Sequence, residues 1–184
     1  MKIDGVHRLH MGVAEGGKLL ALKGRHQEAL AKYREALQLA HGARAPQLFA
    51  RHYLHCVLES LEHLGDHARV AELAGAAADH AANPDPTPFQ KRDRAHLLER
   101  QGVNLARAGD VPGARAVLAA ALELDAGLPL ARAMLDWTAR GLAINPARLA
   151  EAQRKHGYWV VRPDTVDAAR VMESPLFATE TVHG

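Results

Sequence analysis

Hydrophobic residues between Gly17 and Ala40 recur at steps of three and four, the spacing of side chains on one face of an α-helix. They are Leu19 and Leu20, followed by Ala29, Leu30, Tyr33, Ala36 and Leu37. Gly24 interrupts the pattern where the chain needs a tight turn. The pattern therefore predicts a helical hairpin, two short helices folded back on each other, with the first helix beginning near Val6.

The same pattern returns further along the chain. It predicts a second hairpin over residues 46–82 with its turn at Gly65, and a third over residues 88–124 with its turn at Gly109. A fourth, imperfect hairpin is expected from residues 128–142 and 145–157. Because each hairpin covers an apolar face of its neighbour, the chain should form an array of stacked helices.

The boundary between the second and third hairpins is marked by three prolines within residues 83–88. Proline lacks a backbone N–H donor and biases the preceding residue toward extended geometry, so this stretch must be a loop. Thr87 is followed three residues later by Gln90, the spacing of a capping box. We therefore expect the next helix to begin at Pro88.

Composition agrees with an all-α fold. Hydrophobic residues make up 48% of the 184-residue chain, but aromatic residues only 4%. The core must then be built mainly from Ala and Leu, which favour closely packed helices over a sheet. The length is that of one domain with a sizeable core.

Two of the hairpins carry a recognisable set of residues. In the first they are Gly17, Gly24, Glu28, Ala29, Leu30, Tyr33, Ala36, Leu37 and Leu39; in the third they are Leu98, Gly102, Leu105, Gly109, Asp110, Ala114, Leu118, Ala121, Leu122 and Leu124. This pattern resembles the tetratricopeptide repeat. The resemblance implies a right-handed solenoid of antiparallel helical hairpins with three to four repeats, occupying residues 1–157, and a C-terminal capping segment over residues 158–184.

The resemblance also implies a function. Proteins of this family commonly bind a peptide or helix of another protein in a concave groove lined by the first helix of each hairpin. In this chain the expected groove residues are Lys18 and Leu22; His52, His55, Glu59, Glu62 and His63; and His96, Glu99, Arg100, Val103 and Arg107. We therefore expect a non-enzymatic adaptor or assembly factor that needs no cofactor.

Charge and cysteine content narrow the class of partner and the compartment. The formal net charge is only +2, which is no footprint of nucleic-acid binding. The single cysteine, Cys56, cannot form an intramolecular disulfide, and the first residues lack the apolar core of a secretion signal. No apolar run approaches the roughly 20 residues that cross a bilayer. These features predict a cytoplasmic protein without a membrane span.

Two alternatives come from the same residues. His52, His55 and Glu59 lie on one face of a predicted helix, and His96 with Glu99 lies on another, so the chain could bind a metal or act as a metalloenzyme. No nucleophile motif and no phosphate-binding loop accompanies them. Self-association through exposed solenoid ends is the other alternative.

The C-terminal part changes character. Residues 158–161 are strongly apolar and should pack on the final hairpin, because leaving them exposed would create an aggregation-prone apolar patch. Residues 174–184 offer only Leu176, Phe177 and Val182 to offset the entropy of ordering, and should order only against a partner surface.

Overall fold

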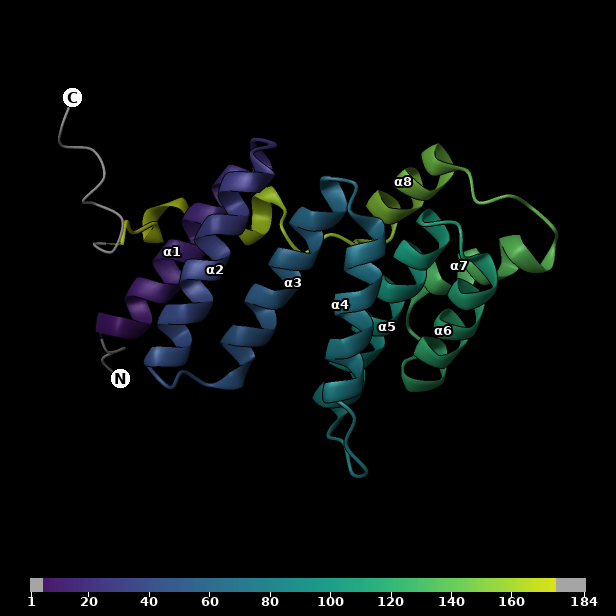
Figure 1. Ribbon diagram of the computed structural model, residues 1–184, viewed down its shortest axis with the longest axis horizontal. Coiled ribbons are helices and arrows are strands. Elements are labelled where there is room, and N and C mark those ends of the chain that lie inside the picture. The colour runs from purple at the N-terminus through teal and green to yellow at the C-terminus, as the bar shows by residue number, and fades with distance from the viewer. Residues whose placement is uncertain (1–4, 175–184) are drawn as a thin grey trace. The chain divides into compact units, whose positions relative to one another are not determined.

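The computed structural model describes residues 5–174, and in this range the regular structure is entirely helical, as predicted (Figure 1). The helices are α1 (Gly5–Leu22), α2 (His26–Gly42), α3 (Gln47–His63), α4 (His67–His80), α5 (Pro88–Arg107), α6 (Val111–Leu124), α7 (Pro129–Ala139) and α8 (Pro146–Lys155), followed by two 3-10 turns, η1 (Pro163–Thr165) and η2 (Ala168–Arg170). None of these helices is both long and apolar enough to cross a membrane.

The chain divides into two compact units. Unit 1 contains residues 5–64 and 160–174 of the described chain, and unit 2 contains residues 65–159. The two helices of the expected second hairpin, α3 and α4, therefore belong to different units. The predicted boundary at residues 157 and 158 lies close to the point where the chain returns to unit 1. We call residues 160–174 the return segment.

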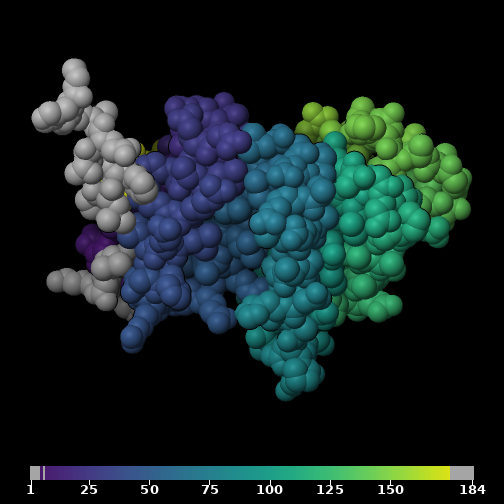
Figure 2. Space-filling view, viewed as in Figure 1, coloured from purple at the N-terminus to yellow at the C-terminus, as the bar shows by residue number. Residues whose placement is uncertain are grey.

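Within each unit, consecutive helices pack against each other. In unit 1, α1 packs on α2 and α2 on α3, and η2 of the return segment contacts α1. In unit 2, α4 packs on α5, α5 on α6 and α6 on α7. The loop between α4 and α5 protrudes from unit 2, and residues 82–85 in it are exposed (Figures 1 and 2).

Local sequence signals place the helix ends. Gly24, Gly65 and Gly109 have φ angles of 74°, 82° and 96°, which residues with a Cβ atom adopt only with strain. Thr87 accepts a hydrogen bond from the Gln90 N–H at 3.2 Å, and the Gln90 side chain accepts one from the Thr87 N–H at 2.9 Å. This is the predicted capping box. The three turns and the start of α5 therefore lie where the sequence predicts them.

A glycine against a large side chain brings the helices of one hairpin together in each unit. In unit 1, a Cβ on Gly17 would lie 2.6 Å from Cε1 of Tyr33; in unit 2, a Cβ on Gly102 would lie 2.5 Å from Cγ of Leu118. Tyr33 and Leu118 are both buried. The Tyr33 ring lies directly on Gly17. The glycine thus provides the space that the ring fills.

Replacing Gly17 with Ala should lower the free energy of unfolding of unit 1. The added methyl group overlaps the Tyr33 ring, so overpacking outweighs the gain in helix propensity and the net loss is about 1 to 2 kcal/mol. Urea unfolding followed by far-UV circular dichroism measures it. Gly42→Ala is the matched control, since nothing lies within 4 Å of its Cβ position. Equal losses for both variants would contradict the packing role of Gly17.

Candidate functional site

The residues expected to line a groove fall into both units. Unit 1 holds Lys18, Leu22, His52, His55, Glu59, Glu62 and His63; unit 2 holds His96, Glu99, Arg100, Val103 and Arg107. Half of them are buried: Lys18, Glu59, Glu62, Glu99, Arg100 and Val103. A continuous groove through three hairpins stays a prediction. What the structure shows is how the residues of each unit are used within that unit.

Glu59 on α3 binds the backbone of the return segment. Its Oε2 atom accepts a hydrogen bond from the Val160 N–H at 2.6 Å, and its Oε1 atom accepts one from the Val161 N–H at 3.1 Å. Only 3% of Glu59 is exposed, so the carboxylate has lost most of its water. Two N–H donors compensate for that loss, and bonds to a charged acceptor are stronger than neutral ones. The pair holds a non-helical stretch of chain.

Next to this contact, unit 1 offers an apolar site for side chains of the return segment, with Val160 and Val166 packed against it. Val161 is buried in a cluster with Ala29, Tyr33 and Cys56. Ala29 and Tyr33 come from α2 and Cys56 from α3. Glu59 is three residues beyond Cys56, so it lies on the same face of α3. Backbone recognition by Glu59 and side-chain recognition by the cluster therefore act on adjacent residues.

Helix α1 binds the rest of the return segment. Glu15 accepts a hydrogen bond from the Asp167 N–H at 2.8 Å through Oε2, while its Oε1 atom accepts one from Lys18 at 2.8 Å. The Met172 N–H donates to the carbonyl oxygen of Gly12 at 3.2 Å. A Cβ atom on Gly12 would lie only 2.6 Å from the Arg170 carbonyl oxygen. The close approach of the segment to α1 thus requires glycine at this position.

An ion pair also joins the return segment to α2: the Nζ atom of Lys32 lies 2.7 Å from the Oε2 atom of Glu173. We define the receiving face as Gly12, Glu15, Lys32 and Glu59 together with the apolar cluster Ala29, Tyr33 and Cys56. It is formed by α1, α2 and α3, and it is entirely within unit 1.

Sequence reasoning placed Glu59 and Lys18 at the site but missed Gly12, Glu15 and Lys32. Lys18 acts through Glu15, which it holds in place for the Asp167 N–H. A signal for Gly12 existed, because Gly16 follows it one helical turn later and two small residues on one helix face permit close approach of another segment. Nothing in the sequence pattern distinguished Glu15 or Lys32 from a solvated charge.

The expected docking of residues 158–161 on the final hairpin is wrong for Val160 and Val161, which bind Glu59 of unit 1. Tyr158 stays within unit 2, where the Arg100 guanidinium lies 4.6 Å from the centre of its ring. The two valines bind Glu59 because their N–H groups have no partner within a helix and need an acceptor elsewhere. Residues 175–184, which were expected to await a partner, lie outside the described residues.

The predicted groove residues of unit 2 hold its own C-terminal helices. Glu99 accepts a hydrogen bond from the Ala131 N–H in the first turn of α7 at 3.0 Å. Burial raises the pKa of the Glu99 carboxyl to about 7. Arg107 donates to the Gln153 side chain on α8 at 3.2 Å. These groups are used for folding the unit, with a carboxyl poised to titrate near neutral pH.

The histidines of the metal alternative are divided between the units. His52, His55 and Glu59 belong to unit 1, and His96 to unit 2. Burial, together with the charge of Lys18, lowers the pKa of His52 to about 4, so its ring is neutral at physiological pH. Among the described residues, no group of three or more His, Cys, Asp or Glu side chains could hold a metal ion. Both oxygens of Glu59 accept N–H groups instead.

Replacing Glu59 with Gln should loosen the return segment. The amide keeps the shape of the carboxylate but loses its charge, and its NH2 group cannot accept the second N–H. Loss of charge-assisted bonds worth about 1.5 to 3 kcal/mol predicts roughly 10- to 100-fold faster hydrogen exchange at the Val160 and Val161 amides. Exposed Glu72→Gln is the control. Unchanged exchange in Glu59→Gln would show that the carboxylate does not hold the segment.

Glu99 should make the stability of the protein depend on pH. In the unfolded chain the carboxyl ionises near 4.5, whereas in the folded chain it keeps its proton up to about 7. The unfolded state therefore binds fewer protons, so the free energy of unfolding falls as pH rises through this window and levels off above it.

The difference between wild type and Glu99→Gln isolates this effect, because every other titratable residue is common to both proteins. Relative to the variant, wild type should lose about 2 to 3 kcal/mol between pH 5 and pH 8. Urea unfolding at both pH values measures it. Parallel pH profiles of the two proteins would contradict a raised pKa at Glu99.

Comparison with known proteins does not assign the chain to a family. No family model matches the chain, no curated protein matches it, and no solved structure matches it. The contacts of its own residues therefore carry the argument about function.

Proposed function

We propose that the protein is a non-enzymatic adaptor or assembly factor that binds a peptide of another protein on the receiving face of unit 1. The observation that carries this proposal is the pair of hydrogen bonds from the Val160 and Val161 N–H groups to the two oxygens of Glu59. In the interior of a helix both N–H groups would be used within the helix. Adjacent N–H groups point to opposite sides of an extended strand, so a face that takes both is suited to a non-helical, bent stretch of chain, as at Val160.

The receiving face combines general with selective recognition. Glu59, Glu15 and the Gly12 carbonyl accept backbone N–H groups, which every residue except proline provides. The apolar cluster around Tyr33 selects one aliphatic side chain, and Lys32 selects an acid. Extended peptides are commonly bound in this way, with main-chain bonds supplying affinity and side-chain pockets supplying specificity.

A tetratricopeptide-like, right-handed array of hairpins is part of the proposal. It is supported by the recurrence in both units of one packing device, Gly17 against Tyr33 and Gly102 against Leu118. Both pairs are spaced alike along the chain, and in both a turn glycine with positive φ, Gly24 or Gly109, lies between the two members of the pair. We place the protein in the cytoplasm, where the single buried cysteine would stay reduced.

Selection from a display library of unstructured peptides tests the function. The full-length protein should enrich peptides with an aliphatic residue at one position and an acid about twelve residues further on, and Glu59→Gln should weaken their binding at least about 10-fold. Glu72→Gln should bind as wild type does. Peptides that bind wild type and Glu59→Gln equally would remove the receiving face as the binding site.

A further inference from the structure

We propose that the return segment is a tethered competitor, which occupies the receiving face in cis and is displaced by a partner segment of the same chemistry. The inference rests on the proposed function and adds its regulation and the kind of partner segment. The partner is a peptide of another protein with an aliphatic residue in the place of Val161 and an acid in the place of Glu173.

The contacts of the return segment define what can replace it. It donates hydrogen bonds to the receiving face from the backbone N–H groups of residues 160, 161, 167 and 172. Its side chains add selectivity: Val161 is buried in the apolar cluster with Val160 and Val166 packed against it, and Glu173 pairs with Lys32. Another peptide can make the same bonds if it is not proline at the four donor positions. Recognition therefore does not require that the segment belong to this chain.

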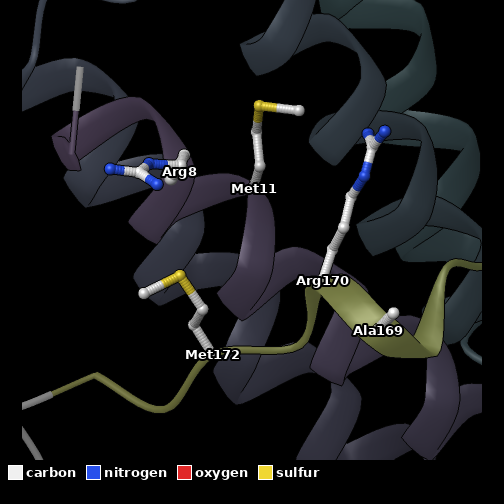
Figure 3. Close-up of a pocket in the computed structure, with 5 residues that line it drawn as sticks. All are labelled: Arg8, Met11, Ala169, Arg170 and Met172. Carbon is white, nitrogen blue, oxygen red and sulfur yellow. The ribbon is translucent and has the colours of Figure 1, made fainter. Parts of the chain in front are cut away.

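The return segment is also shallowly seated. Of residues 160–174, only Val161 and Ser174 are buried. Between α1 and the end of the segment lies a cavity of about 350 Å³ (Figure 3). It is lined by Arg8 and Met11 of α1 and by Ala169, Arg170 and Met172 of the segment. Segments with few buried apolar contacts open at lower free energy than the core of a protein, so the segment can leave while the α1–α3 helices stay folded.

The covalent connection explains why such a shallow segment can still control access. The return segment and the receiving face belong to one chain, so the segment cannot diffuse away when it leaves the face. Short tethers give effective concentrations of about millimolar. A free peptide then binds with an affinity reduced by the fraction of molecules whose face is open. Anything that holds the segment away would raise partner binding without changing the face.

Val160→Pro in the full-length protein separates the segment from the face. Proline removes one of the two N–H donors to Glu59 and leaves every residue of the receiving face unchanged. Ala168→Pro is the matched control: Ala168 is exposed and opens η2, where proline is accepted, and the preceding Asp167 is already extended.

The probe is a fluorescein-labelled synthetic peptide with the sequence of residues 159–174, titrated by fluorescence anisotropy. Val160→Pro should bind it about 10- to 100-fold more tightly than wild type, and Ala168→Pro should bind it as wild type does. Adding Glu59→Gln to Val160→Pro should remove at least a factor of about 10. In wild type, saturating unlabelled peptide should accelerate hydrogen exchange at the protein's own Val160 and Val161 amides, a result that does not depend on a variant folding.

The outcomes distinguish the two proposals. Equal affinity of wild type and Val160→Pro, with binding that still requires Glu59, would overturn the competitor and leave the adaptor function standing. Binding that ignores Glu59, or no binding to any variant, would overturn both. Concentration-dependent dimers of wild type that disappear in Val160→Pro would make a second copy the occupant, and would overturn the assignment to another protein's segment. Light scattering detects this last case.

Discussion

The carboxylate of Glu59 is the interaction on which the arrangement of unit 1 depends. Burying a carboxylate without N–H donors would cost more free energy than the surrounding contacts could offset. A non-helical segment without acceptors would leave its own N–H groups unsatisfied. Each supplies what the other lacks, since the Val160 and Val161 N–H groups meet both oxygens of Glu59. The C-terminal part of the described chain is therefore tied to α3, far away in sequence, rather than to the helix before it.

Glycine sets how closely the elements approach around this contact. Gly17 admits the ring of Tyr33, which then forms one wall of the cluster that buries Val161. Gly12, earlier in the same helix, admits the backbone of the return segment. Helix α1 thus faces α2 through one glycine and the return segment through another. Small residues on α1 determine both the packing of the hairpin and the shape of the receiving face.

Glutamate side chains in the two units both accept backbone N–H groups. Glu59 accepts them from the return segment, whereas Glu99 accepts one in the first turn of α7. Both carboxyls lie on a helix that was expected to line a groove, and both are buried by chain from further along the sequence. The chemistry of a peptide-binding surface and that of intramolecular docking are the same here, because both bring backbone N–H groups to fixed acceptors.

Local physics allowed the helices to be predicted from the sequence. Helix periodicity, turn glycines and helix caps act within a few residues, so the sequence alone predicts them. Examples are the periodic Leu and Ala positions, the positive-φ glycines at 24, 65 and 109, and the Thr87 capping box. Burial of Tyr33 and Leu118 also followed from helix periodicity. Glu59 and Lys18 were expected to bind a partner because the resemblance to the tetratricopeptide repeat places them on the first helix of a hairpin.

Tertiary structure alone decided what those polar groups contact. The pairing of Glu59 with Val160 joins residues about a hundred positions apart, and no periodicity of either segment records it. The same holds for Glu15 with Asp167 and for Lys32 with Glu173, whose side chains look like ordinary surface charges in the sequence. The division between α3 and α4 is of this kind too. Local propensity specifies helices and turns, whereas long-range contacts depend on which unsatisfied groups meet once the helices have packed.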